Sequence, residues 1–198
     1  MIELNNLENS EPYIIFKNFY KNALEKKQDS IEAISISSFN KNNNEVESRF
    51  VNLKYVNVNE WIFFTNYGSQ KAQDFETHDQ ITALFFWAKI NVQIRLKAII
   101  KKTPHKFSDI HFKNRSIEKN ALAISSKQSQ KIDSYENVIK MYENSLSKDQ
   151  LKIRPIYWGG FSFKPYYFEF WEGHESRINK RIEFEFCSGE WLKSFLQP

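Results

Sequence analysis

The chain has 198 residues, and its 28 basic and 24 acidic side chains leave a formal net charge of +4. This length suits one domain, and because the basic residues are dispersed among acidic ones, the charge does not predict a nucleic-acid-binding surface. A single cysteine, Cys187, excludes an internal disulfide framework and a cysteine-based metal cluster, and we expect no metal site.

Apolar residues occur in short runs, none of which is long enough to cross a membrane. The acidic, Asn-rich start lacks the charge and apolar segment of a signal peptide, so we expect a cytoplasmic protein that does not bind membranes. The 18 Phe, 9 Tyr and 5 Trp supply a large buried area per residue. Because aromatic and β-branched residues recur in short runs, the pattern favours a β-rich core.

The first half of the chain predicts two helices and a series of strands. Residues 1–10 are polar, and we expect them to be disordered. Glu11-Pro12 begins an amphipathic helix, and a second, short helix runs from Gln70 to about His78. Strands are predicted at residues 31–38, 49–56, 61–65, 81–88 and 92–101, with Asn-rich turns between the earlier ones.

The second half predicts helices followed by more strands. Helical patterns cover residues 107–127 and 134–147, and strands follow at 161–163, 166–172 and 182–186. Six or more strands with helices at the start and in the middle predict a β-rich α+β fold, a closed or split β-barrel with flanking helices. We expect residues 11–198 to form a single domain.

Three motifs near the C-terminus have the most informative composition. They are Trp158-Gly159-Gly160-Phe161, Glu169-Phe170-Trp171-Glu172-Gly173 and Arg177-Ile178-Asn179-Lys180-Arg181. Paired glycines between aromatic residues allow close backbone approach. Arginine forks suit planar anions, and an adjacent tryptophan can cover a flat ring. These motifs therefore predict a site for a flat, anionic ligand.

The order of these motifs resembles the C-terminal signature of the pyridoxine/pyridoxamine 5'-phosphate oxidase family. Four further stretches match family motifs in register: residues 49–54, residues 64–71, Trp87 followed by Gln93, and residues 126–129. The resemblance implies an FMN-binding split barrel, assembled as a homodimer with the flavin at the subunit interface.

The resemblance also implies which residues bind FMN. Arg49 and Lys71 hold its phosphate, while Gln70 stands where the family has a further arginine. The flavin itself is lined or hydrogen-bonded by residues from several segments of the chain. These are Val51, Asn52, Leu53, Lys54, Phe64, Thr65, Gln93, Gln128 and Ser129, with Trp171 and Arg181 contributed by the partner subunit.

For the substrate phosphate, the resemblance points to Lys54, His111, Arg115 and Lys119, where His111 and Lys119 replace a family Tyr and Ser. Both replacements can donate to a phosphate. If this segment is helical, the last three share one face and make a more cationic phosphate site. Residues at that spacing are otherwise typical of a solvated helix face, so this alternative stays open.

The family's Arg-x-His pair, which contacts the pyridine ring, reads here as Arg177-Ile178-Asn179. Asparagine can donate or accept a hydrogen bond but does not titrate near neutral pH. Arg177 and Asn179 are therefore the candidate catalytic residues, with reactivity supplied mainly by the flavin.

These inferences predict an enzyme that oxidises pyridoxine or pyridoxamine 5'-phosphate with O₂, giving pyridoxal 5'-phosphate and H₂O₂. Two alternatives remain open. One is a related flavoprotein with another substrate, and the other is a non-catalytic protein that binds FMN or pyridoxal phosphate. A third, remote alternative is a nucleic-acid-binding β-barrel, which would need a contiguous basic face.

Overall fold

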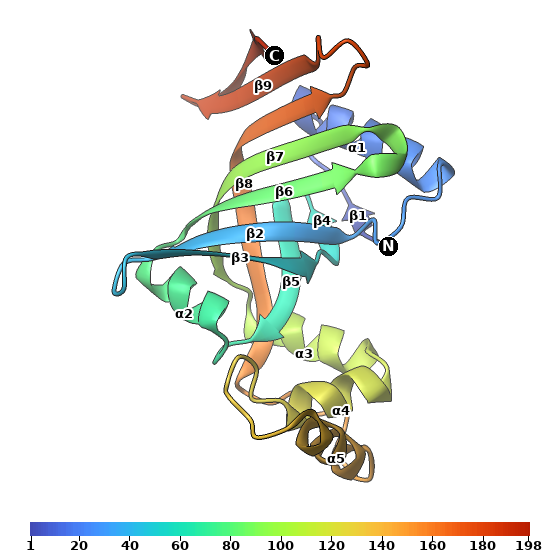
Figure 1. The fold of residues 1–198 in the computed structure, drawn as a ribbon, viewed down its shortest axis with the longest axis vertical. Coiled ribbons are helices and arrows are strands. Elements are labelled where there is room, and N and C mark those ends of the chain that lie inside the picture. Colours follow the sequence, from blue (N-terminus) through green and yellow to red (C-terminus); the bar gives the residue numbers. More distant parts are fainter.

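The computed structural model describes all 198 residues as one curled, ten-stranded sheet with helices around it (Figure 1). The strands are β1 (Glu3–Asn5), β2 (Ala33–Asn40), β3 (Glu45–Asn52), β4 (Tyr55–Asn57), β5 (Glu60–Asn66), β6 (Gln80–Trp87), β7 (Val92–Lys102), β8 (Trp158–Glu172), β9 (Lys180–Cys187) and β10 (Glu190–Leu196). The helices are α1 (Glu11–Glu25), α2 (Gln70–Thr77), the 3-10 turn η1 (Ala88–Ile90), α3 (His105–Asn114), α4 (Ile117–Ser125) and α5 (Tyr135–Leu146).

The sheet runs in the order β1-β4-β5-β8-β7-β6-β2-β3, and its end strands β1 and β3 do not pair with each other. The barrel is therefore split. Strand β8 pairs with β7 on one side, while on its other side it pairs first with β5 and then with β9. Strand β10 extends the sheet beyond β9, with which it pairs. The predicted β-rich α+β fold is confirmed.

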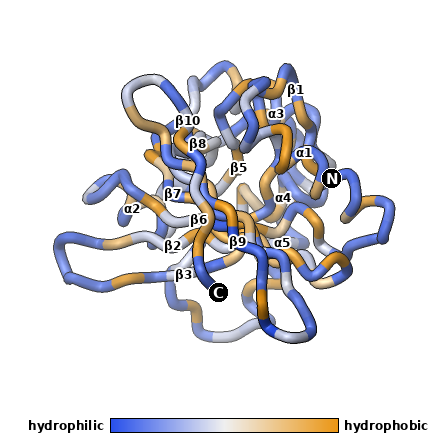
Figure 2. Tube along the Cα trace, turned by 90° about the horizontal axis from the view of Figure 1, so that it is seen from above, coloured by the Kyte–Doolittle hydropathy of each residue, from blue (hydrophilic) through white to orange (hydrophobic).

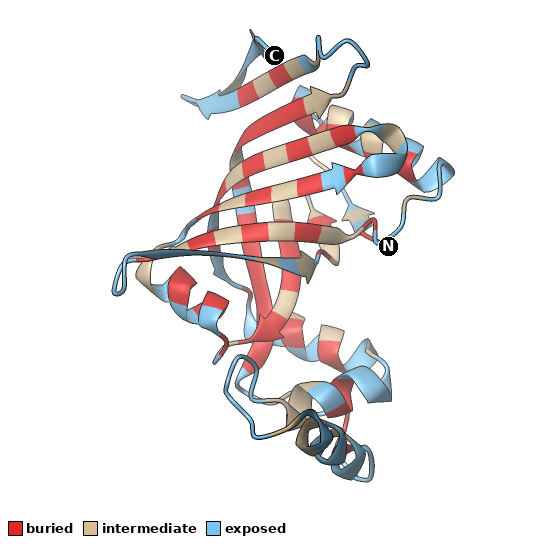
Figure 3. Ribbon diagram, viewed as in Figure 1, coloured by how far each residue is buried: buried red, intermediate tan, exposed pale blue.

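Alternation along the strands explains how the core forms. In β7 the hydrophobic residues from Val92 to Ala98 alternate with polar ones, and in β2 every second residue is buried, including the polar Ser38 and Asn40 (Figure 3). Hydrophobic and hydrophilic residues are intermingled along the chain trace (Figure 2). Of the 52 buried residues, 29 hydrophobic ones form a single core cluster. Helix α1 packs against this core through Phe16, whose ring centroid lies 4.5 Å from that of Trp61 and 5.9 Å from that of Trp87. None of the helices combines the length and apolar character needed to cross a membrane.

The prediction that residues 1–10 are disordered was wrong. Strand β1 pairs in parallel with β4, and Ile2 is only 5% exposed. The Tyr20 hydroxyl accepts a hydrogen bond from the Ile2 amide at 2.7 Å and donates one to the Ile2 carbonyl at 3.1 Å. A polar composition does not reveal a partner more than 50 residues away, and pairing with β4 is what orders this segment.

Several predicted boundaries also differ. The strand expected at 49–56 is two strands, because β3 ends at Asn52 and β4 begins at Tyr55. The helical pattern at 107–127 is interrupted at Arg115, whose ψ of 158° is extended. The two strands expected at 161–172 are one, since β8 absorbs Pro165 at a register shift opposite Lys97 and Ala98. Strand β10 was missed, as its largely exposed residues show little alternation.

Candidate functional site

About half of the predicted site residues line one cavity of about 570 Å³, between the end of β3, the strands β5 and β8, and the helices α3 and α4. We call it the cationic cavity. Ten of the predicted residues line it: Val51, Asn52, Lys54, Phe64, Thr65, Lys71, His111, Arg115, Lys119 and Gln128. Trp158, Glu3 and Met1 also line it, so the ordered N-terminal segment reaches the site.

Lys71 is a buried cation with no carboxylate in ion-pair range. Its side chain enters the cavity from the first turn of α2, and the residue is 7% exposed. Its ammonium group has only hydroxyl partners, Thr65 and Ser69, each at 3.4 Å. Burial, together with the nearby charge of Arg49, lowers the pKa of Lys71 to about 8. A buried ammonium in this state is a favourable partner for an anion.

Arg49 lies close to Lys71 but is held by a buried carboxylate, that of Asp74 on α2. Its guanidinium donates to Ser38 Oγ at 2.6 Å and to Asp74 Oδ2 at 3.4 Å. Asp74 is fully buried and also accepts from Ser38, Asn40 and Gln70. The predicted ligand residues Arg49 and Gln70 are thus absent from the cavity wall, and Gln70 instead helps to satisfy Asp74.

The end of β3 explains how Arg49 and Lys54 serve one region although they are five residues apart. An uninterrupted strand would place them on opposite faces. Here β3 ends at Asn52, and Lys54 follows the strand end before β4 begins. Arg49 therefore faces α2 and Lys54 lines the cavity.

His111, Arg115 and Lys119 all line the cavity, but not from one continuous helical face. Helix α3 ends at Asn114, and α4 begins after Ser116, whose side chain accepts from the Lys119 amide. The bend between the helices brings the three side chains around the cavity.

Arg115 lies flat against Trp158, with its guanidinium carbon 4.4 Å from the ring centroid. Its Nη1 atom is buried without a hydrogen-bond partner. Burial lowers the pKa of Arg115 to about 10, which leaves the group charged at neutral pH. A buried donor of this kind is costly unless a ligand pairs with it.

His111 is a neutral, immobilised ring. It stacks on Phe64 with 3.7 Å between centroids and an angle of 3°, and its Nδ1 lies 2.8 Å from the Tyr55 hydroxyl. Burial and the charges of Arg115 and Lys54 lower the pKa of His111 to about 4. The expectation of an extra cation at this position was therefore wrong, although a neutral imidazole can still donate through one nitrogen. Sequence analysis did not identify Tyr55, whose role depends on a contact 56 residues away.

The charge and shape of the cavity fit a planar ligand that carries phosphate. Four cations line it, Lys54, Lys71, Arg115 and Lys119, against one carboxylate, that of Glu3. Phe64 and Trp158 stack on each other, with 5.4 Å between ring centroids and an angle of 8°, and together form one aromatic wall of the cavity. The unpaired Arg115 donor and the carboxylate-free Lys71 are the buried groups that such a ligand would satisfy.

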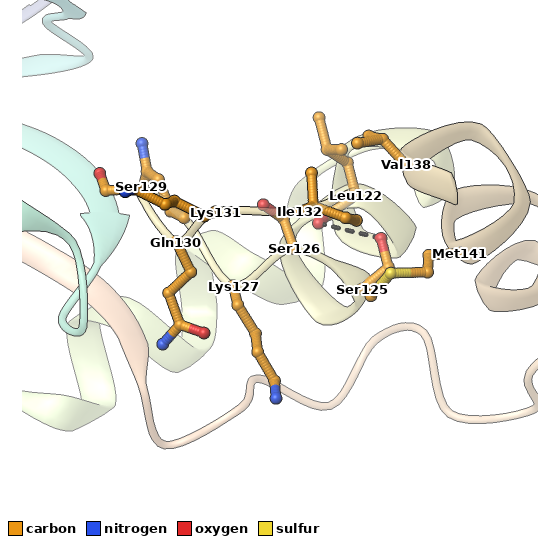
Figure 4. A pocket seen from close by; sticks show the side chains of 11 residues that line it. Leu122, Ser125, Ser126, Lys127, Ser129, Gln130, Lys131, Ile132, Val138 and Met141 are labelled. Atoms are coloured by element: carbon orange, nitrogen blue, oxygen red, sulfur yellow. Dashed lines mark hydrogen bonds between the residues drawn. The ribbon is translucent and has the colours of Figure 1, made fainter. Parts of the chain in front are cut away.

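Gln128 lines both the cationic cavity and a second cavity, whereas its neighbour Ser129 lines only the second. Gln128 Oε1 accepts from the Thr65 hydroxyl at 3.0 Å and from the Asn66 amide at 3.3 Å, which ties its loop to β5 beside the cationic cavity. Ser129 has a positive φ of 70° and lines this second cavity, of about 400 Å³, between α4 and α5 (Figure 4).

The remaining predicted residues lie at the other end of β8. Trp171 is opposite Gln93 on β7 and opposite Arg181 on β9. Arg177 and Asn179 lie in the loop between β8 and β9, where Asn179 Oδ1 accepts from the His174 amide at 3.0 Å. None of these five residues lines the cationic cavity.

The length of β8 separates this second group from the cavity. Trp158 and Trp171 are thirteen residues apart on one strand, which at the usual rise is up to about 40 Å. Figure 1 shows β8 running from α3 to β9. A single chain therefore does not bring the two groups to one small ligand.

Comparison with known proteins identifies relatives of the chain. Residues 158–198 match the family model described as the pyridoxine 5'-phosphate oxidase C-terminal dimerisation region. Over 193 residues the chain is 33% identical to pyridoxine/pyridoxamine 5'-phosphate oxidase 1 of Hydrogenovibrio crunogenus, covering 96% of this chain and 89% of that relative.

Solved structures show the same fold. PhzG from Burkholderia lata, in complex with tetrahydrophenazine-1-carboxylic acid, has a TM-score of 0.90 at 21% identity, covering 96% of this chain and 93% of its own. A pyridoxamine 5'-phosphate oxidase-related, FMN binding protein from Nostoc punctiforme has a TM-score of 0.77 at 13% identity, covering 92% and 97%. At these identities the likeness concerns the fold. The full-length sequence similarity decides the family, and it confirms the resemblance read from the motifs: the chain belongs to the pyridoxine/pyridoxamine 5'-phosphate oxidase family.

Proposed function

We propose that this protein is an FMN-dependent oxidase that converts pyridoxine 5'-phosphate or pyridoxamine 5'-phosphate to pyridoxal 5'-phosphate. The observation that carries the proposal is the cationic cavity, which four basic side chains and one aromatic wall line together with a single carboxylate. Bound FMN would supply the redox chemistry by accepting hydride from the substrate and passing the electrons to O₂ to give H₂O₂. With pyridoxamine 5'-phosphate the reaction would also consume water, which supplies the aldehyde oxygen, and release the nitrogen as ammonia.

Lys71 and Arg49 are the proposed binding residues for the FMN phosphate. Lys71 offers a desolvated point charge, and Arg49, fixed by Asp74, adds a second positive charge close by. Val51, Asn52, Lys54, Thr65 and Gln128 line the cationic cavity and would contact the rest of the cofactor. The side chain of Leu53 is buried in the core and does not line the cavity, so this residue would contribute only its backbone. Gln70 would contribute indirectly, by donating a hydrogen bond to Asp74, and would not contact the ligand.

The substrate phosphate is assigned to Lys54, Arg115 and Lys119, with His111 as a neutral donor. Arg115 Nη1 lacks a partner, and a phosphate oxygen would satisfy it. The hydroxyl of Tyr55 orients His111, so that the imidazole contributes a hydrogen bond without adding charge.

The residues at the far end of β8 are proposed to act in a second subunit's site. In a homodimer, Trp171 and Arg181 of one chain would contact FMN beside the cationic cavity of the other. Gln93 pairs with Trp171 across strands, so it would act with them, and Arg177 and Asn179 would orient the substrate ring. Support comes from the match of residues 158–198 to a dimerisation region and from the separation along β8.

A related flavin oxidase with another substrate is the second candidate. Its supporting observation is Asn179, whose side-chain oxygen is already used by its own loop, which leaves only the amide nitrogen for a substrate. The phosphate-sized cluster of cations favours a phosphorylated substrate over one that carries only a carboxylate.

The test is anaerobic mixing of FMN-loaded protein with pyridoxine 5'-phosphate, followed by the visible absorbance of the flavin. We expect bleaching that recovers when air is admitted. Unphosphorylated pyridoxine is the matched control and should bleach the flavin far more slowly, because Lys54, Arg115 and Lys119 then have no phosphate to bind. A flavin that stays oxidised with both phosphorylated vitamers would exclude the proposed reaction.

A further inference from the structure

A buried carboxylate lies on the outer face of the sheet, at the far end of β8. Along β8, Phe168 and Phe170 face the core, so Tyr167, Glu169 and Trp171 share the opposite face. Glu169 is nevertheless only 3% exposed, because neighbouring side chains cover it. Burying a carboxylate on a face that could have stayed in water is costly unless it is fully paired.

Two arginines pair with Glu169, one at each carboxylate oxygen. Arg95, opposite Glu169 on β7, donates to Oε2 through Nε at 3.0 Å and through Nη2. Arg181 on β9 approaches Oε1 through Nε at 2.9 Å and Nη2 at 2.7 Å. The Tyr167 hydroxyl points mainly to Glu183, at 2.8 Å, and is 3.4 Å from Glu169. These two guanidinium pairs keep the pKa of Glu169 below its ordinary value despite burial.

The pairing fixes the direction of the Arg181 side chain. Its Nη1 also donates to the Gln197 carbonyl at 2.8 Å, so three of its five N–H donors are used and two remain. Arg181 lies beside Trp171 in the cross-strand register. An arginine left free on a strand would sample many rotamers, whereas this one is held before any ligand arrives.

We propose that Glu169 is a positioning residue, which holds Arg181 so that its two remaining donors meet the FMN bound in the neighbouring subunit. This inference rests on the proposed function. Arg95 neutralises the second carboxylate oxygen and makes the buried charge tolerable, without itself contacting the cofactor.

The test compares FMN affinity in full-length variants, measured by quenching of flavin fluorescence. Glu169→Gln keeps the size of the side chain but weakens its hold on Arg181, and we expect roughly ten-fold or greater loss of FMN affinity, as for other residues that orient a ligand-binding group. Glu183→Gln is the matched control: it removes the same charge from the same face, and its affinity should equal that of the wild type.

A double-mutant cycle separates positioning from general stability. If Glu169 acts through Arg181, Glu169→Gln should cost no further affinity once Arg181→Ala is present, while the melting temperature still falls. Sedimentation should show dimers throughout. Should Glu169→Gln fail to fold, the charge-balanced Arg95→Met/Glu169→Gln variant replaces it with the same expected affinity loss.

Two results would overturn the inference: wild-type affinity in the Glu169 variant, or a full additional loss in the Arg181→Ala background. Affinity lost only through dissociation of the dimer would overturn it as well. If the wild-type protein itself binds no FMN, the proposed function fails instead, and the two failures are distinguishable.

Discussion

At the scale of single residues, Lys71 is a buried cation whose burial affects the stability of the fold. Its pKa of about 8 in the folded protein lies below the ordinary 10.5, so between these values the unfolded chain holds more protons and stability rises with pH. At pH 7 both states carry the charge, and burial then costs on the order of 3 kcal/mol. A bound anion would offset that cost.

The corresponding prediction concerns Lys71→Met in the absence of FMN. We expect the cofactor-free variant to be more stable than the wild type, by about 1–3 kcal/mol, because a buried charge is replaced by an apolar chain of similar size. Its affinity for FMN should fall strongly. Denaturant unfolding and flavin titration measure the two effects, and a variant that loses stability without losing affinity would contradict this account.

His111 predicts a pH dependence of the same sign in a more acidic range. Its pKa falls from 6.5 to about 4 on folding, so between these values the unfolded chain binds more protons, and stability declines as the pH falls through that window. Between pH 7 and pH 5 the loss is expected to be about 2 kcal/mol. His111→Gln, which cannot titrate, should lack this part of the decline in urea unfolding curves recorded at the two pH values. If the wild type and His111→Gln lose the same stability between pH 7 and pH 5, His111 is not buried as a neutral ring.

At the scale of elements, the N-terminal strand closes one end of the sheet and reaches the site. Strand β1 pairs with β4, and its first residue Glu3 and the preceding Met1 line the cationic cavity. Tyr20 on α1 hydrogen-bonds both backbone groups of Ile2. Helix, strand and cavity wall are thus linked through one short segment.

Ile2→Ala tests whether this segment is part of the folded core. Because Ile2 is buried, we expect a loss of about 2 kcal/mol or more in the free energy of unfolding. Asn9→Ala, at an exposed position of the same segment, should leave stability unchanged. Equal stability of the two variants would mean that the first residues are a free tail.

At the scale of the whole molecule, the two groups of site residues lie at opposite ends of β8, and only a second chain could unite them. Mixed dimers test this directly. Lys71→Met and Arg181→Ala chains should each bind FMN weakly alone. In a mixed dimer one of the two sites would receive an intact Lys71 and an intact Arg181.

After dissociation and random reassociation of the two variants, about half the dimers are mixed, so about a quarter of all sites should regain tight FMN binding. Flavin titration of the mixture measures that fraction, with each variant treated alone as the control. No recovery in a mixture shown to contain mixed dimers would place both residues in one chain's site.

The sequence by itself determined the strand-rich fold, the positions of most elements and the family. Strand alternation and helical spacing depend on neighbours within a few residues, so they can be read from the sequence. The order of the family motifs can also be read without a structure. The resemblance also named ten residues that do line one cavity. These residues belong to short sequence motifs, and the position of each motif in space is set by the fold that the family shares.

Tertiary structure decided what depends on distant partners. Tyr55 orients His111, Asp74 holds Arg49, and the break after Asn114 bends a predicted single helix around the cavity. The charge state of His111 and the burial of Lys71 follow from surroundings assembled from several strands and helices. The spacing of hydrophobic residues along the sequence does not reveal such contacts, because desolvation and pairing arise only when residues far apart in the chain pack together.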